Sequence, residues 1–212
     1  MRNLIVEFIG TFFLALTAAL SGNALAIGVV LMVMVYAGGH ISGGHYNPAV
    51  TAAVFFRGRI KLPEALQYIA AQFAAAVLAV IIGLVWHIKA PEFDMTGKQF
   101  FQNLTAEVLG TFALAYVMLN VATTKKLEGN PFYGAAIGLT VLAMAAAFGQ
   151  AFNPAVALAI ALLQKAHFSI IFSCLIGSSV AAFGAAIVVN LLQGDGPQAL
   201  QKATPPPVPP QV

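Results

Sequence analysis

Asn47-Pro48-Ala49-Val50 and Asn153-Pro154-Ala155-Val156 are two copies of one motif, separated by 106 positions. Proline has no N–H and a preset φ, so each Asn is well placed to cap a short helix that begins at the proline. The apolar stretches that follow, 47–56 and 153–163, are too short to cross a bilayer as helices. The two motifs therefore predict two half-length helices.

The composition is that of a membrane protein. Of the 212 residues, 60% are hydrophobic and only 8% are charged, and the mean hydropathy is +0.88. In an ordinary soluble domain about 25% of the residues are charged. The length accommodates about six spans of roughly 20 residues each. A soluble globular protein is therefore excluded.

The same composition argues against several other classes of protein. The net charge of +3 comes from scattered basic residues, which gives no surface for nucleic acid. Cys174 is the single cysteine, and nothing resembles a metal-binding cluster, a phosphate loop or a nucleophile with its base. We expect no metal, no cofactor, no nucleic-acid partner and no enzymatic activity.

A second pair of matching segments shows that the chain contains an internal repeat. Val6-Glu7-Phe8-Ile9-Gly10-Thr11-Phe12 matches Ala106-Glu107-Val108-Leu109-Gly110-Thr111-Phe112, 100 positions later. Each half reads as span, span, half-helix, span, and the six expected spans are 3–20, 24–38, 63–87, 101–121, 131–147 and 168–192. Because each half has three spans, the second half starts on the opposite side of the membrane and the repeat is inverted.

These features predict an all-α membrane protein with six transmembrane helices and two re-entrant half-helices. We expect a first repeat with its linker at 1–100, a second repeat at 101–192, and a disordered, proline-rich tail at 193–212. A cleaved signal peptide is the alternative for the first 20 residues. The recurrence of that segment inside the chain argues against it, because a discarded leader would not be duplicated.

The basic residues predict the orientation. With the N-terminus in the cytoplasm, seven of the ten are cytoplasmic, namely Arg2, Arg57, Arg59, Lys61, Lys125, Lys126 and Lys202. The other three are outside, namely Lys89, Lys98 and Lys165. This bias favours cytoplasmic N- and C-termini. The short loops suggest a prokaryotic-type plasma (inner) membrane.

The paired motifs predict a polar site at the membrane midplane. A capping Asn turns its side-chain oxygen toward the helix N–H groups, so the NH2 groups of Asn47 and Asn153 stay free to donate. Two half-helices that enter from opposite sides present two positive dipole ends to the same spot, which disfavours cations. The irregular segments before the motifs, 38–45 and 148–152, are tolerated at membrane depth only where they line a water-filled path or are buried in protein.

Glu7 and Glu107 are isolated carboxylates at matching positions of apolar spans. Either they couple transport to protons, or they anchor the loops by accepting backbone hydrogen bonds. Their symmetry favours anchoring. Gln72, in the middle of the third span, is expected to make an interhelical hydrogen bond.

The twin Asn-Pro-Ala motifs, the Glu-x-x-Gly-Thr-Phe starts of both halves and the sequence Gly39-His40-Ile41-Ser42-Gly43-Gly44-His45-Tyr46 resemble the aquaporin (major intrinsic protein) family. The resemblance implies a homotetramer in the lipid bilayer, with one pore per subunit that passes water or small neutral solutes. It places Asn47, Pro48, Ala49, Asn153, Pro154 and Ala155 at the central constriction. It also implies that Glu7, Glu107 and Gln72 brace the loops, and that Gly43, Gly44, His45 and Gly149 line the vestibules.

The selectivity filter departs from the family pattern. Family members usually carry an Arg after the second motif, and this chain has Val156 there. The resemblance assigns Ile27 and Gln150 to two further filter positions and Ala145 to the fourth, with Val141 as the alternative. A missing fixed charge removes roughly 4 kcal/mol of repulsion on a cation about 4 Å away. We expect an apolar filter that excludes ions less strictly.

The sequence therefore predicts a passive channel for water, glycerol, urea, ammonia or dissolved gas. Two alternatives stay open. The inverted repeat is also typical of proton-coupled secondary transporters, and an apolar filter can dewet, which suits a non-conducting membrane assembly protein.

Overall fold

The computed structural model describes residues 1–86, 97–163 and 169–193, and within these ranges the chain is helical with no strand. The long helices are α1 (Arg2–Ser21), α2 (Ala24–Ser42), α4 (Leu62–Gly83), α5 (Gly97–Thr123), α6 (Tyr133–Phe148) and α8 (Ser169–Gln193). The short ones are α3 (Pro48–Phe56), α7 (Pro154–Leu163) and the 3-10 turns η1 (Leu84–Trp86) and η2 (Lys125–Leu127). The predicted all-α fold is confirmed.

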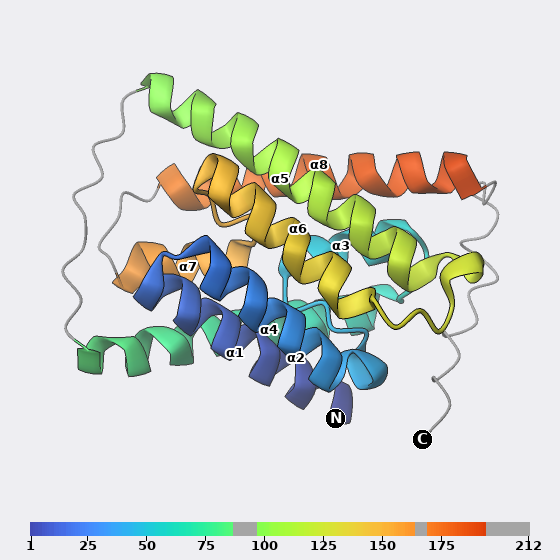
Figure 1. Cartoon of the computed structure of the whole chain (residues 1–212). Helices are drawn as coiled ribbons and strands as arrows, with labels where there is room; N and C mark the ends of the chain where they lie inside the picture. The colour runs from blue at the N-terminus through green and yellow to red at the C-terminus, as the bar shows by residue number, and fades with distance from the viewer. Residues whose placement is uncertain (87–96, 164–168, 194–212) are drawn as a thin grey trace.

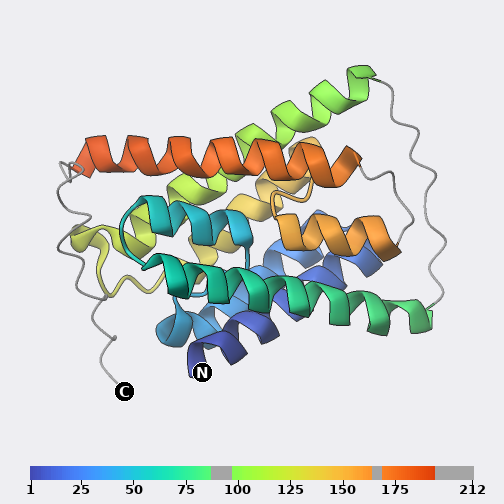
Figure 2. The ribbon, with the colours of Figure 1, turned by 180° about the vertical axis from the view of Figure 1, so that it is seen from behind.

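The long helices form one bundle around the two half-helices. Figure 1 shows α3 and α7 starting near the middle of the bundle and running toward opposite ends, and Figure 2 shows the same arrangement from behind. Helices α1 and α5, which begin the two halves, run in opposite directions along the bundle (Figure 1). An inverted repeat has this arrangement.

Five of the described helices have the length and hydropathy of a membrane span, namely α1, α2, α4 with η1, α5 and α8. Helix α6 is apolar too but has only 16 residues. Helix α5 begins at Gly97, four residues before the predicted start of the second repeat, and α8 includes Gln193, where the tail was predicted to begin. The rest of that tail, Lys89 and Lys165 lie outside the described residues.

One expected loop is mostly helical. The sequence predicted irregular backbone from Gly38 onward, but α2 continues to Ser42 and ends at Gly43, whose φ of 90° is the left-handed conformation that favours glycine. Gly38 and Gly39 remain in the helix because neighbours pack against them. A Cβ on Gly38 would lie 2.4 Å from the Tyr46 hydroxyl oxygen, and one on Gly39 2.9 Å from the Tyr133 ring.

The two halves interlock. Helix α1 packs on α4 and α5 packs on α8 within each half, whereas α2 packs on α6 between the halves. Gly28 and Gly138 face each other at that contact, and a Cβ on either would lie 2.5–2.7 Å from the carbonyl oxygen of the other. The half-helices cross over as well, since α3 packs on α8 and α7 packs on α4. Each half-helix is therefore held by the other half of the chain.

Candidate pore

The two Asn side chains link the half-helices at their N-termini. Asn47 Oδ1 accepts from the backbone N–H of Ala49 at 2.8 Å, and Asn153 Oδ1 accepts from that of Ala155 at 3.0 Å. Each amide also donates across the repeat. Asn47 Nδ2 donates to the Phe152 carbonyl at 2.8 Å, and Asn153 Nδ2 donates to the Tyr46 carbonyl at 2.9 Å. Since an NH2 group has two hydrogens, each Asn keeps one for a further acceptor.

Tyr46 and Phe152 accept these two cross-repeat hydrogen bonds, and neither was a predicted site residue. Both are non-glycine residues with positive φ, 48° and 50°, which turns their carbonyls toward the opposite half. Each ring packs on a glycine of the first helix of its own half, since a Cβ on Gly10 or Gly110 would lie 2.2 Å from the Tyr46 or Phe152 ring. The signal was present, because these glycines belong to the repeated Glu-x-x-Gly segments.

Glu7 lies at the centre of a buried hydrogen-bond network. Its side chain has no exposed surface, and Oε1 accepts from the Ser42 hydroxyl at 2.7 Å and from the His45 N–H at 2.9 Å. Oε2 accepts from the Tyr46 N–H at 2.7 Å and from Gln72 Nε2 at 2.9 Å. These four donors satisfy the carboxylate, which offsets the cost of burying it.

Glu107 is equally buried but has a smaller set of partners. It accepts from the backbone N–H groups of Ala151 at 3.1 Å and Phe152 at 3.0 Å. The buried thiol of Cys174 lies beside its carboxylate. Both glutamates thus bind the loop that precedes the half-helix of their own half.

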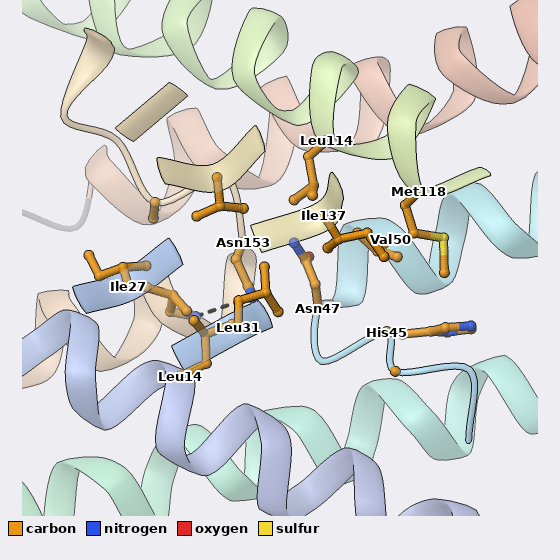
Figure 3. Close-up of a pocket in the computed structure, with 14 residues that line it drawn as sticks. Leu14, Ile27, Leu31, His45, Asn47, Val50, Leu114, Met118, Ile137 and Asn153 are labelled. Atoms are coloured by element: carbon orange, nitrogen blue, oxygen red, sulfur yellow. Dashed lines mark hydrogen bonds between the residues drawn. The ribbon is translucent and has the colours of Figure 1, made fainter. Parts of the chain in front are cut away.

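A narrow cavity passes between the two Asn residues. Its lining comes from α1, α2, α5, α6 and both loops with their half-helices, and consists of Leu14, Ile27, Leu31, Gly44, His45, Asn47, Val50, Leu114, Met118, Ile137, Val141, Ala151, Asn153 and Val156. Figure 3 shows Ile27 and His45 on opposite sides of the Asn pair. Most of the lining is aliphatic, and the pairs Leu14 with Leu114 and Val50 with Val156 occupy matching positions of the repeat.

The cavity contains some of the predicted site residues and not others. Ile27, Val156, Gly44, His45 and the two Asn residues line it. Gly43, Gly149, Gln150 and Ala145 are not among the lining residues, whereas Val141, the alternative to Ala145, is. Gln150 Nε2 donates instead to Asn103 Oδ1 on α5, at 3.0 Å. The four Pro and Ala residues of the motifs are buried.

The described lining includes no carboxylate. Glu7 and Glu107 are both absent from it, so their charge is directed at the loops and not at the cavity. Within the described ranges, no group of three or more His, Cys, Asp or Glu residues is placed to hold a metal ion.

Comparison with known proteins identifies relatives of this chain. The family model described as Major intrinsic protein matches residues 1–188. Aquaporin NIP1-1 of Zea mays is 35% identical over 91% of this chain and 75% of its own length, and Nodulin-26 of Glycine max is 32% identical over 91% and 78%. The crystal structure of the aquaglyceroporin from Plasmodium falciparum covers 95% of this chain and 99% of its own, with a TM-score of 0.71 at 20% identity.

These matches confirm a multi-pass integral membrane protein and the resemblance found in the sequence. The curated relatives named above are plant proteins, so the comparisons give no support to the expected prokaryotic-type inner membrane. Because the family model spans most of the chain, the protein belongs to the major intrinsic protein family.

Proposed function

We propose that the protein is a passive channel for water and small neutral solutes, with a path that runs through the described cavity. The crossed Asn pair carries this proposal, since each amide is fixed by its bond to the opposite loop and keeps one hydrogen for a passing solute. Proteins of this family are channels and not enzymes, and the Zea mays relative bears the name aquaporin.

Exclusion of cations follows from the placement of the half-helices. The N-termini of α3 and α7 meet at the Asn pair, and each contributes about half a positive elementary charge. The lining supplies no carboxylate to offset it among the described residues. A neutral hydrogen-bond acceptor therefore passes this point more easily than a cation.

For the filter we assign Ile27, Val141 and Val156, all three of which line the cavity. In this assignment we replace Ala145 by Val141, and we leave Gln150 out because its amide donates to Asn103. An aliphatic filter without a fixed cation suits glycerol, urea, ammonia or dissolved gas, with weaker ion exclusion at the mouth.

Proton-coupled transport is the weaker reading. It needs Glu7 or Glu107 exposed to the path, but both are fully buried and occupied by loop hydrogen bonds. A non-conducting assembly role keeps the same fold and is decided by the flux measurement below.

The oligomer and the orientation complete the proposal. Large aliphatic and aromatic side chains are exposed along the outer faces of α1, α4 and α8, among them Ile9, Ile81 and Phe183, and these faces meet lipid or other subunits. We infer a homotetramer, as the family resemblance implies, with both termini in the cytoplasm because basic residues gather on that side. Light scattering coupled to size-exclusion chromatography measures the subunit number.

Stopped-flow light scattering on proteoliposomes tests the channel. We expect faster shrinkage in a sucrose gradient and faster re-swelling in a glycerol gradient than with empty vesicles. Val156→Arg should narrow the filter and raise the ratio of water to glycerol permeability. Glu128→Arg, at an exposed position after η2 and away from the cavity lining, serves as the control. Folded protein that passes neither solute would overturn the proposal.

A further inference from the structure

The polar part of the cavity differs between the two halves. His45 lines the cavity in the first half, and the position 106 residues later, which matches it in the repeat, is Ala151. Thr51 on α3 contacts the His45 ring, and its counterpart on α7 is Ala157. A titratable ring and a hydroxyl therefore occur together in one half and are both absent from the other.

The hydrogen bonds of Thr51 determine which ring nitrogen of His45 carries a proton. Thr51 Oγ1 donates its single hydrogen to the Asn47 carbonyl at 3.0 Å. The same oxygen accepts from Gln72 Nε2 at 2.9 Å and lies 3.1 Å from His45 Nδ1. Because the hydroxyl hydrogen is already used, His45 Nδ1 has to be the donor in the last contact.

Gln72 and Glu7 hold this arrangement in place. Gln72 Nε2 donates one hydrogen to Glu7 Oε2 and the other to Thr51, so the amide can present only hydrogens to the hydroxyl. Thr51 and Gln72 have no exposed surface, and His45 is 6% exposed. The ring of Tyr68 lies 5.2 Å from that of His45 and restricts its orientation. The imidazole is thus positioned from two sides.

We propose that Thr51 is a positioning residue that keeps the proton of neutral His45 on Nδ1, so that Nε2 is a hydrogen-bond acceptor on the cavity wall, and that this acceptor favours solutes able to donate a hydrogen bond. The inference rests on the proposed channel function. A solute crossing an aliphatic wall loses its hydrogen bonds to water, and each replacement partner lowers that cost. The Asn pair serves the acceptor groups of the solute, and His45 serves its donor groups.

Nitrogen NMR on the full-length protein in lipid tests the tautomer without any flux. The His45 signals are those that disappear in His45→Gln. At a pH where the imidazole of His45 is neutral, we expect a protonated Nδ1 and an unprotonated Nε2, both in wild type and in Thr51→Ser. A wild-type spectrum with the proton on Nε2 would overturn the proposal.

Flux measurements test the consequence for solutes. Thr51→Val keeps the shape and removes the hydroxyl, Thr51→Ser restores it, and Thr111→Val is the control because that buried hydroxyl has no partner among the described residues. Glycerol donates and accepts, whereas dimethyl sulfoxide only accepts. Loss of one hydrogen bond should lower glycerol permeability about five-fold in Thr51→Val, with little change for dimethyl sulfoxide, for Thr51→Ser or for Thr111→Val.

Two flux results would overturn the proposal: unchanged glycerol permeability in Thr51→Val, or an equal fall for glycerol and dimethyl sulfoxide, which indicates a structural defect only. Failure of the proposed function has a different signature. In that case wild-type vesicles pass neither water nor glycerol, while the NMR spectrum still reports the tautomer of His45.

Discussion

The loops that precede the two half-helices are held by the same backbone contacts but by different side chains. Glu7 and Glu107 each accept two successive backbone N–H groups, of His45 and Tyr46 in one half and of Ala151 and Phe152 in the other. In the first half the side chains of Ser42 and Gln72 also donate hydrogen bonds to the carboxylate. In the second half the Cys174 thiol lies beside the carboxylate instead.

The backbone contacts are common to both halves, whereas the additional hydroxyl and amide donors occur, among the described residues, in the first half alone. Two backbone donors per carboxylate suffice to hold a re-entrant loop, since both halves have them. The extra donors extend the first-half network through Gln72 and Thr51 to His45. The first loop is therefore the more firmly held one and the one that carries the polar cavity wall.

We expect the largest loss of stability from Glu7→Ala. It leaves four buried donors without an acceptor, and removing one partner of a buried charged network costs roughly 3–5 kcal/mol. Glu107→Ala leaves fewer donors and should cost about 2–3 kcal/mol. Thermal unfolding in detergent compares the stability losses of the two variants. Glu128→Ala, at an exposed position, is the control. Equal losses for Glu7 and Glu107 would break the comparison.

Gly10→Ala and Gly110→Ala should come next. Each new methyl group pushes against an aromatic ring, and overpacking costs typically 1–3 kcal/mol. Gly10→Ala should be the worse, because the Tyr46 hydroxyl donates to the Met34 carbonyl at 2.9 Å and ties down the far end of its ring. Gly184→Ala is the control, since a Cβ on Gly184 would lie 3.8 Å from its nearest neighbour, the Phe112 ring. Tolerance of Gly10→Ala with loss in Gly110→Ala would reverse our order.

Asn47→Ala and Asn153→Ala should have similar effects. Each removes a helix cap worth about 1 kcal/mol and one donor of the cavity, and each leaves a carbonyl of the opposite half without its partner. We expect water and glycerol permeability to fall in both. Asn23→Ala also removes a cap, on α2, and should leave permeability unchanged. Unchanged flux in a well-folded Asn153→Ala protein would remove that residue from the pore.

Cys174→Ala should have the smallest effect. The thiol is a weak donor, so its loss should cost about 0.5–1 kcal/mol of stability. Cys174→Ser should restore stability, because a hydroxyl donates to the Glu107 carboxylate more strongly than a thiol does. Thermal unfolding of the two variants beside wild type checks this, and a loss as large as that of Glu107→Ala would mean that the thiol is the main partner.

Much of the fold was predictable because its signals are local and repeated. The two Asn-Pro pairs predicted capped half-helices, and α3 and α7 begin at Pro48 and Pro154. The role of each glycine was harder to predict, because glycine is typical both of helix ends and of closely packed positions inside helices. Gly43 ends α2, but Gly38 and Gly39 accept the neighbouring Tyr46 and Tyr133 side chains, which nothing in their own segment reveals.

The lining of the cavity was less accessible to sequence reasoning. Counting back along the fifth span depends on the length of the loop after it, so the sequence favoured Ala145 where Val141 lines the cavity. Gln150 has the right position in its loop, yet its amide turns to Asn103 on α5. Both outcomes depend on how two segments meet in space.

The sequence by itself determined the membrane class, the inverted repeat, the two half-helices and the family, because hydropathy, capping and repetition are written along the chain. Only the tertiary structure decided that each Asn bonds to the opposite loop, that Glu7 has more partners than Glu107, and that His45 meets Thr51. The physical reason is that hydrogen bonds and cavity walls form between side chains that folding brings together from both halves.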